Sequence, residues 1–378
     1  MLLPDPLLIF RRKPKFSITL SACEKREPPP FTHPFNAMPH QKNKVTIYDV
    51  ANHAGVAIST VSRVLNNSND VSDRTRARVL EAIETLKFRP DRTAKNLAQQ
   101  ATHLLAVALP TFTTPFHIEL MKGIRSRLRD QDVDLLLCDL GSKKRHQSLM
   151  NFLKRGAVDG LLLAGVDVNE EIAQELHALH APVVLIGSRR DEFDSFYWDD
   201  VAGARQAVEH LIDLGHRRIG MIKTNTGSPL QNRRVQGYRE ALEAAGIPYD
   251  ETLLSSGHTR KHAGFSEEAG YEAMEALLLL DPPVTAVFAS SDVQAIGAWK
   301  AAIDAGRKVP DDIAIVGYDD IKTSQFIGLT SMDQDMQTIG LRAADRLLQR
   351  MSDTFTEPPI AELVTPKLRV RRSSRRKD

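Results

Sequence analysis

The clearest hydrophobic pattern of the chain lies between residues 45 and 67. Apolar or small residues recur with the 3.6-residue period of a helix and stop at Gly55; they are Ile47, Val50, Ala51 and Ala54. A second run with the same period follows directly, at Ile58, Val61, Val64 and Leu65. Two short helices joined by a glycine-containing turn have the spacing of a helix-turn-helix, although any amphipathic helical hairpin gives the same coarse pattern.

A third helix is predicted after the polar loop from Asn67 to Val71. Ser72 is a good N-cap residue, and the apolar face that follows consists of Val79, Ala82, Ile83 and Leu86. This face should pack on the first two helices. The arginines of the same segment stay on its outside, where they either contact phosphates or form an ordinary solvated surface; they are Arg74, Arg76 and Arg78.

Beyond His103 the pattern changes to short apolar runs that alternate with amphipathic stretches. The apolar runs cover residues 104–109, 133–138, 158–164, 183–186, 219–222, 286–289 and 313–316. Strands that alternate with helices predict an α/β domain with parallel sheets covered on both faces, and the segment is long enough for two such units. In such sheets, small ligands bind outside the carboxyl ends of the strands.

Composition and charge narrow the function only slightly. The chain has 378 residues and a formal net charge of +2, so any basic surface for nucleic acid must be local. Cys23 and Cys138 stand far apart, which argues against a disulfide framework or a structural zinc site and fits a cytoplasmic protein. No metal or cofactor is expected. No apolar run approaches the length of a transmembrane helix, so no membrane partner is expected.

The first 44 residues are predicted to form a disordered extension. They contain eight prolines and show no sustained periodicity. The segment from Leu20 to Cys23 resembles a lipoprotein cleavage box. However, the basic run from Arg11 to Lys15 interrupts the apolar region that a secretory signal needs, which argues against such a signal. Met38 lies just ahead of the first helix, and it is an alternative start of the protein.

The helical region resembles the DNA-binding headpiece of the lactose-repressor/galactose-repressor family of bacterial transcription regulators. The similar phrases are TIYDVA, HAGV and STVSRVLN at fixed spacing within residues 45–90. The resemblance implies contacts to DNA phosphates by Thr46, Tyr48, Thr60, Ser62 and Asn66. It implies that Ile58, Ser59 and Arg63 face the bases. The family usually has a hydroxyl residue where this chain has Ala57, so a helix cap is missing or is shifted to Ser59.

Residues 91–101 connect the headpiece to the large domain. Within them, Asp91 to Ala98 is too polar for a core element and too short to stay helical alone. The resemblance implies a hinge helix that orders on operator DNA and inserts Leu97, with Ala94 beside it, into the minor groove of the central base step. A plain linker with a solvated leucine is the alternative.

Residues 102–370 resemble the two-lobed periplasmic-sugar-binding-protein fold that this family joins to its headpiece. The recurring phrases include PVVLIG, HLIDLGHRRIG, VPDDIAIVGYDD and LTSMDQ. The resemblance implies an effector-binding cleft between the lobes. Its expected contacts are Phe116, Arg234, Phe265, Ser291, Asp319 and Gln334.

Three departures from the family bear on the effector. Gly187 stands where the family often has an acidic residue, and Arg189 and Arg190 follow at once. These arginines either recognise an anionic ligand or lie on the surface. Trp198 replaces a small strand residue, and it either lines the cleft or packs beneath it.

The sequence favours a binding protein over an enzyme. It has no GxSxG, P-loop, HExxH or dinucleotide-binding motif, so no catalytic residue is expected. The basic end from Lys367 to Asp378 lacks leucine heptads, which excludes a coiled coil of that kind, and residues 371–378 are predicted to be a disordered tail.

These features predict a transcriptional repressor that binds operator DNA as a homodimer under the control of a sugar or sugar acid. A solute-binding protein of a transport system is the rival, and an enzyme is a distant third.

Overall fold

The computed structural model describes residues 45–65, 68, 70–88, 102–141, 144–155, 158–352 and 354–375. They fall into two compact units, which divide after Asp91. The predicted extension 1–44, the hinge 91–101 with Ala94 and Leu97, and Asn66 lie outside the described residues. Within the described part of the chain, no helix combines the length and apolar character that crossing a membrane requires.

The first unit consists of three helices at the predicted positions, namely α1 (Ile47–Ala54), α2 (Ile58–Leu65) and α3 (Asp73–Thr85). Thr46 begins α1 with a capping box, because its hydroxyl accepts from the Asp49 amide while the Asp49 carboxylate accepts from the Thr46 amide at 2.8 Å. Gly55 ends α1 at φ +60°, a conformation that favours glycine. The core of the unit joins all three helices through Val50, Val61 and Val79.

The α1–α2 turn is fixed from outside by α3. Arg78 donates through Nη2 to the Ala54 carbonyl at 2.5 Å, so this arginine braces the turn in addition to carrying charge. Ala57 precedes α2, and its carbonyl accepts from the Thr60 amide at 2.9 Å. Its methyl group offers no side-chain cap. Ser59 lies inside the first turn of α2, so the structure favours loss of the cap over its transfer to Ser59.

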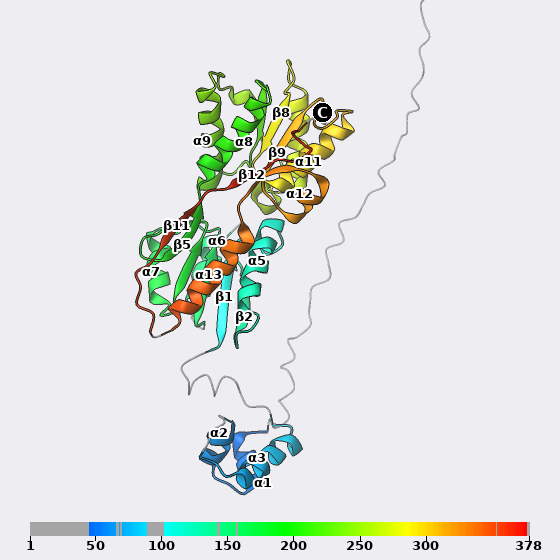
Figure 1. The fold of residues 1–378 in the computed structure, drawn as a ribbon. Coiled ribbons are helices and arrows are strands. Elements are labelled where there is room, and N and C mark those ends of the chain that lie inside the picture. The colour runs from blue at the N-terminus through cyan, green and yellow to red at the C-terminus, as the bar shows by residue number, and fades with distance from the viewer. Residues whose placement is uncertain are drawn as a thin grey trace, which may run out of the picture. The chain divides into compact units, whose positions relative to one another are not determined.

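The second unit contains two sheets, each covered by helices on both faces (Figure 1). The first sheet has the strand order β11-β5-β4-β3-β1-β2, and all of its neighbouring strands are parallel. Its strands are β1 (Leu104–Leu109), β2 (Asp134–Asp139), β3 (Gly160–Ala164), β4 (Val183–Ile186), β5 (Asp194–Trp198) and β11 (Ala361–Val364). Its helices are α5 (Pro115–Leu128), α6 (Arg145–Leu153), α7 (Glu170–Ala178) and α13 (Met336–Arg350).

Alternate residues of the central strands divide this first lobe into two cores. On β1, Leu105 and Val107 pack with α5 and α13, whereas Ala106 and Ala108 pack with α6 and α7. A strand that is buried on both faces reads as a continuous apolar run, which explains why β1 and β3 were evident from the sequence.

The second sheet has the strand order β12-β10-β9-β8-β6-β7 and is parallel except at β12, which runs antiparallel to β10. Its strands are β6 (Ile219–Ile222), β7 (Leu254–Ser255), β8 (Ala286–Ala289), β9 (Ala314–Asp319), β10 (Thr330–Asp333) and β12 (Lys367–Arg369). Helices α8 (Asp200–Asp213) and α9 (Pro229–Ala244) share one core with this sheet, and α10 (Glu267–Leu278) and α11 (Asp292–Asp304) share the other. The short helix α12 (Lys322–Ile327) follows β9.

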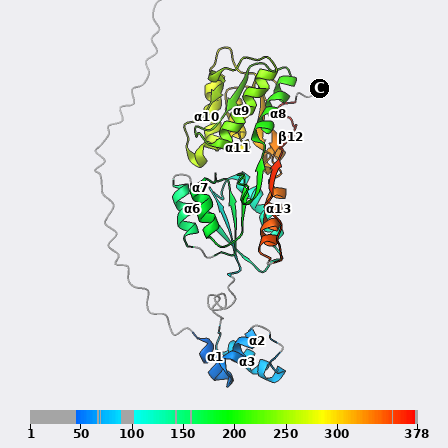
Figure 2. The same ribbon diagram turned by 90° about the vertical axis from the view of Figure 1, so that its left-hand side faces the viewer.

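The chain passes between the lobes three times, and the two views show these passages at the waist of the unit (Figures 1 and 2). The passages are residue 199 between β5 and α8, residues 334–335 between β10 and α13, and residues 365–366 between β11 and β12. Neither lobe is therefore a continuous piece of sequence. Three parallel connections of this kind permit a hinge motion while restricting other relative movements.

The prediction of a disordered tail from residue 371 is wrong for residues 371–375. Ser373 and Ser374 are buried, and the Ser373 hydroxyl donates to the Ile315 carbonyl at 2.6 Å. The hydroxyl groups of the two serines form hydrogen bonds to β9 and β10, so this segment can be buried although it lacks apolar residues. The prediction had relied on apolar residues alone. Residues 376–378 lie outside the described residues.

Candidate functional site

The outward side of α2 carries the residues predicted to read DNA. Val61 and Val64 are buried in the core of the first unit, which turns Ser59 and Arg63 to the outside. Tyr48 and Ile58 are 63% and 40% exposed, so both side chains are available for contact with a partner. Thr60 and Ser62 are partly exposed. The geometry matches a recognition helix that presents one face to a groove.

Thr46 differs from the other predicted DNA contacts. Its hydroxyl donates to the Asp49 carboxylate at 2.7 Å, and its amide donates to the same group at 2.8 Å. These bonds lower the pKa of Asp49 and keep it ionised. Both Thr46 donors are therefore engaged in the helix cap, and a phosphate contact by Thr46 would require this cap to rearrange.

A cavity of about 400 Å³ lies between the two lobes of the second unit. Its wall contains five of the six predicted effector contacts, namely Phe116, Arg234, Phe265, Ser291 and Asp319. Gln334 is buried behind the wall, where its side-chain amide donates to Asp319 Oδ1 at 2.8 Å. The cavity opens at the carboxyl ends of β1, β3 and β4, which is where ligands bind in parallel sheets.

Aromatic side chains form part of this wall. Phe116 packs edge-on against Trp198, with ring centroids 5.7 Å apart, and Phe265 lines the same cavity. Trp198 therefore lines the cleft, which settles the alternatives left by the sequence, and its indole donates to the Gln334 carbonyl at 2.7 Å. Gly187 leaves space beside the indole, because a Cβ at that position would lie 3.5 Å from Trp198 Cζ3.

Arg234 projects from α9 into a fully buried polar network. Its Nε donates to Asp200 at 3.0 Å, Nη1 donates to the Ser290 carbonyl, and the guanidinium stacks 3.7 Å from the centroid of Tyr318. Burial by itself would lower the pKa of Arg234, but the surrounding acidic groups, Asp200 first and then Tyr318 and Asp319, together outweigh burial and the pKa is raised. The guanidinium is a fixed cation that lines the cavity, and it is also part of the core of the second lobe.

Asp319 ends β9 at the floor of the cavity and is 6% exposed. Burial raises the pKa of its carboxyl well above the usual range, although Arg234 acts in the opposite direction. A carboxyl group that retains its proton can donate a hydrogen bond as well as accept one. Asp319 therefore suits a ligand hydroxyl in either role.

His117 and Arg145 were not predicted as wall residues. His117 lies on α5 and shares a 2.6 Å hydrogen bond with the Thr114 hydroxyl; burial lowers its pKa to about 4, helped by the charges of Arg145 and His262. Arg145 begins α6, and burial lowers its pKa although Asp167 opposes this. Both residues lie in the first turn of the helix that follows a parallel strand, α5 after β1 and α6 after β2. This position shortly after a strand was the signal that the sequence offered.

Arg189 and Arg190 do not line the cavity. Arg189 pairs with Asp191 at 3.0 Å, and Arg190 pairs with Glu170 at 2.9 Å and with Glu192. The structure thus supports the surface explanation for these two residues. Among the described residues, no group of three or more histidines, cysteines or carboxylates is arranged to hold a metal ion.

Comparisons with known proteins agree with this geometry. The family model described as bacterial regulatory proteins, lacI family, matches residues 46–91, and a periplasmic binding protein-like domain matches residues 208–374. The HTH-type transcriptional regulator CelR of Thermobifida fusca is 35% identical over 329 residues, which cover 84% of this chain and 95% of CelR.

Two solved structures show the same fold. The CelR–cellobiose complex has 34% identity and a TM-score of 0.63, and the match covers 87% of this chain and 100% of that one. The Lac repressor dimer bound to operator and the anti-inducer ONPF has 27% identity and a TM-score of 0.73, over 87% and 99% of the two chains.

A three-helix unit with an exposed recognition helix and a two-lobed domain with an internal cavity define a DNA-binding regulator of transcription. The chain belongs to the lacI family of bacterial regulatory proteins. Its relatives are transcriptional regulators, and the rival interpretation as a transport solute-binding protein is not favoured.

Proposed function

We propose that this regulator is a homodimeric repressor whose affinity for a palindromic operator is set by a sugar or sugar acid. The cavity carries this proposal, because it combines aromatic faces with buried polar groups in the same chain as a recognition helix. The DNA contacts in this proposal are Tyr48, Ile58, Ser59, Thr60, Ser62 and Arg63, with Thr46, Asn66, Ala94 and Leu97 as further candidates. We infer a cytoplasmic location as part of this proposal, because a repressor acts where the operator DNA lies.

The chemistry of the wall supports a sugar. Phe116, Trp198 and Phe265 offer apolar ring surfaces for the C–H face of a pyranose, and Arg234 and Asp319 offer a donor and a donor–acceptor for its hydroxyls. The relative CelR was solved with cellobiose. Arg145 adds a cation in the opposite lobe, which supports a carboxylate-bearing sugar as the second candidate.

Exposed apolar residues on the first lobe support dimerisation. Strand β2 is an edge of its sheet, and Leu136 and Leu137 on it are 39% and 42% exposed. On the same lobe, Phe112 and Ile118 are 43% and 42% exposed. An edge strand with exposed leucines favours association unless something covers it. The solved Lac repressor is a dimer on its operator.

The proposed control acts through the three passages between the lobes. A ligand that binds both walls of the cavity favours one angle between the lobes over others, which changes the surface that the first lobe offers to its partner. That change would then bias the order of the hinge residues. Because such coupling is a free energy between two sites, operator DNA must alter effector affinity by the same factor as effector alters DNA affinity.

The first experiment is selection of the preferred site from a random duplex library, without ligand and with a panel of sugars, sugar acids and nucleobases. The expected result is one palindromic site whose binding changes with one compound. Arg63→Ala is the control, because it removes a predicted base contact from the exposed side of α2. Recovery of no site under any condition would overturn the proposed operator recognition, and a site that responds to no compound would overturn the proposed effector control.

A further inference from the structure

The floor of the cavity is built on two consecutive strained residues. Asp319 has φ +119° and Asp320 has φ +52°, both in the region of positive φ that non-glycine residues rarely adopt. Such conformations are unfavourable for residues that carry a side chain, and they persist only where the surroundings impose them. Asp319 lines the cavity, so whatever imposes this backbone conformation also sets the position of a candidate ligand group.

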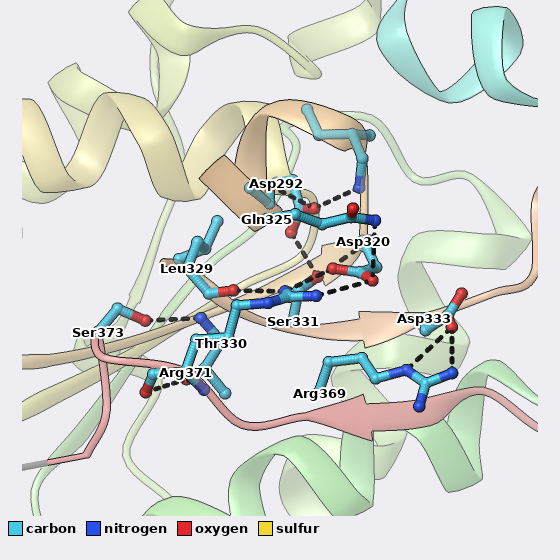
Figure 3. Close-up of polar contacts among 12 residues, drawn as sticks. Asp292, Asp320, Gln325, Leu329, Thr330, Ser331, Asp333, Arg369, Arg371 and Ser373 are labelled. Carbon is cyan, nitrogen blue, oxygen red and sulfur yellow. Dashed lines mark hydrogen bonds and ion pairs between the residues drawn. The ribbon is translucent and has the colours of Figure 1, made fainter. Parts of the chain in front are cut away.

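Asp320 is held mainly by Arg371, which comes from the end of the chain (Figure 3). The guanidinium donates to both carboxylate oxygens, at 2.5 and 3.0 Å, and Nη1 also donates to the Leu329 carbonyl at 2.8 Å. The side chains of Asp320 and Arg371 are 6% and 21% exposed, so the pair is largely shielded from water. In addition, the Asp320 amide donates to the Ser331 hydroxyl at 3.0 Å.

Arg371 is itself fixed by buried contacts on both sides. Its amide donates to the Thr330 hydroxyl at 2.8 Å, and two residues later the Ser373 hydroxyl donates to the Ile315 carbonyl at 2.6 Å. The Thr330 amide donates to the same Ser373 hydroxyl at 2.8 Å. The backbone at Arg371 therefore has little freedom, and its guanidinium is presented to Asp320 from a rigid base.

From this geometry we propose that Arg371 is a positioning residue of the ligand site, which holds Asp319 in its binding conformation through the Asp320 carboxylate. The inference rests on the proposed function of the cavity as an effector site. Without the guanidinium, Asp320 loses its charge partner and the strained pair can relax to negative φ. Asp319 then moves away from Gln334 and from the ligand.

The same segment follows directly on the third passage between the lobes. Residues 365–366 leave β11 in the first lobe, and β12 begins at Lys367 in the second lobe, only a few residues before Arg371. A change in the angle between the lobes therefore acts on the segment that carries Arg371. The C-terminal segment thus connects lobe closure to the floor of the cavity.

A neighbouring ion pair provides a matched control. Arg369 ends β12, two residues before Arg371, and donates to Asp333 at 2.8 and 3.1 Å, but its side chain is 51% exposed (Figure 3). Among the described residues it makes no hydrogen bond to Asp319 or Asp320, and its charge acts on Asp320 more weakly than on Asp333. Loss of this pair removes an arginine–aspartate contact of the same kind from the same segment. Any effect on Asp319 that is specific to Arg371 must therefore be absent from Arg369→Ala.

The first measurement is hydrogen exchange of the full chain without ligand, for Arg371→Ala, Arg369→Ala and the unchanged protein. We expect exchange of the amides of residues 320 and 321 to accelerate about tenfold or more in Arg371→Ala only, with Arg371→Lys intermediate because it keeps a point charge but not the fork. Equal exchange in Arg371→Ala and Arg369→Ala would overturn the proposal. If Arg371→Ala loses protection throughout the second lobe, Asp320→Asn replaces it, because asparagine tolerates positive φ while the variant removes the charge and one of the two oxygens that accept from Arg371. Faster exchange at residues 320 and 321 is expected here too, and exchange as in the unchanged protein would overturn the proposal.

The second measurement is titration of the same variants with cellobiose, followed by Trp198 fluorescence in a Trp299→Phe background. We expect about tenfold weaker binding for Arg371→Ala, equivalent to about 1.4 kcal/mol, and unchanged binding for Arg369→Ala. Equal affinities in these two variants would overturn the positioning role. If the unchanged protein does not bind cellobiose, that result counts against cellobiose as the effector, and the hydrogen-exchange result alone decides the role of Arg371.

Discussion

Arg234 lines the cavity and also belongs to the buried polar network of the second lobe. Replacing it with alanine, beside matched control variants, tests these two roles separately. The variant leaves Asp200 with a side chain that is 3% exposed and with only one remaining arginine, Arg233, at 3.2 Å. It also leaves the Ser290 carbonyl without its guanidinium donor and removes the stack on Tyr318.

The expected cost follows from this arrangement. Removing one partner of a buried ion pair costs about 3–5 kcal/mol, and because Arg233 still faces Asp200 we expect the lower end, about 3 kcal/mol. For a unit that spans Arg92 to Asp378, that corresponds to a fall of roughly 5 °C in the unfolding midpoint. Arg233→Ala is the matched control. Arg233 shares the same carboxylate but its side chain is 38% exposed, so its loss should cost less than about 1 kcal/mol.

Thermal unfolding, operator binding and sugar titration should be measured on Arg234→Ala, Arg233→Ala and the double variant Asp200→Asn/Arg234→Ala. The double variant removes the stranded charge, so it should recover much of the lost stability. If Arg234 also contacts the effector, the double variant will remain insensitive to sugar while it still binds operator. Similar small losses of stability in Arg234→Ala and Arg233→Ala would refute the structural reasoning, and a normal sugar response in the double variant would refute the ligand contact.

Three other predictions test separate parts of the protein. Arg63→Ala should weaken operator binding by about 1–3 kcal/mol and relax the base preference in a site-selection assay, whereas an unchanged profile would remove Arg63 from the recognition surface. Leu97→Ala should lose specific affinity but retain salt-dependent non-specific binding, both measured by fluorescence anisotropy; equal loss of both would indicate a damaged fold. Burial lowers the pKa of His117 from 6.5 to about 4, so the unfolded chain binds the proton more readily and stability should fall by about 3 kcal/mol as the pH drops from 6.5 to 4. Urea midpoints of His117→Gln should lack this part of the pH dependence, and parallel curves for the two proteins would contradict it.

Local signals in the sequence predicted the headpiece almost to the residue. Two of the three helices have a residue with a clear local role at one end, Gly55 at positive φ after α1 and Ser72 as the N-cap of α3, and all three helices have an apolar face. Strands β1, β3 and β4 were equally evident, because burial on both faces makes them continuously apolar. In contrast, β5 begins with Asp194 and Ser195, whose burial depends on partners far along the chain.

The cavity was predicted only in part, for a similar reason. The resemblance to a known family led to Phe116, Arg234 and Asp319, and the structure brings them to one wall. The resemblance gave no indication of His117 or Arg371. Arg371 pairs with Asp320, 51 residues away in the sequence, and neither residue type nor local spacing predicts such a contact. Polar residues that are buried by long-range pairing remain the main limit of inference from a single sequence.

The three passages between the lobes also constrain the order in which the protein can assemble during synthesis. The first sheet lacks its edge strand until Ala361–Val364 has left the ribosome, and α13, which packs against α5, comes almost as late. The amino-terminal lobe must therefore wait, with one face of its sheet covered by α5 but not by α13, while most of the second lobe is translated. The headpiece has no such dependence and can fold as soon as α3 emerges. A nascent chain would thus carry a folded DNA-binding unit well before the domain that controls it is complete.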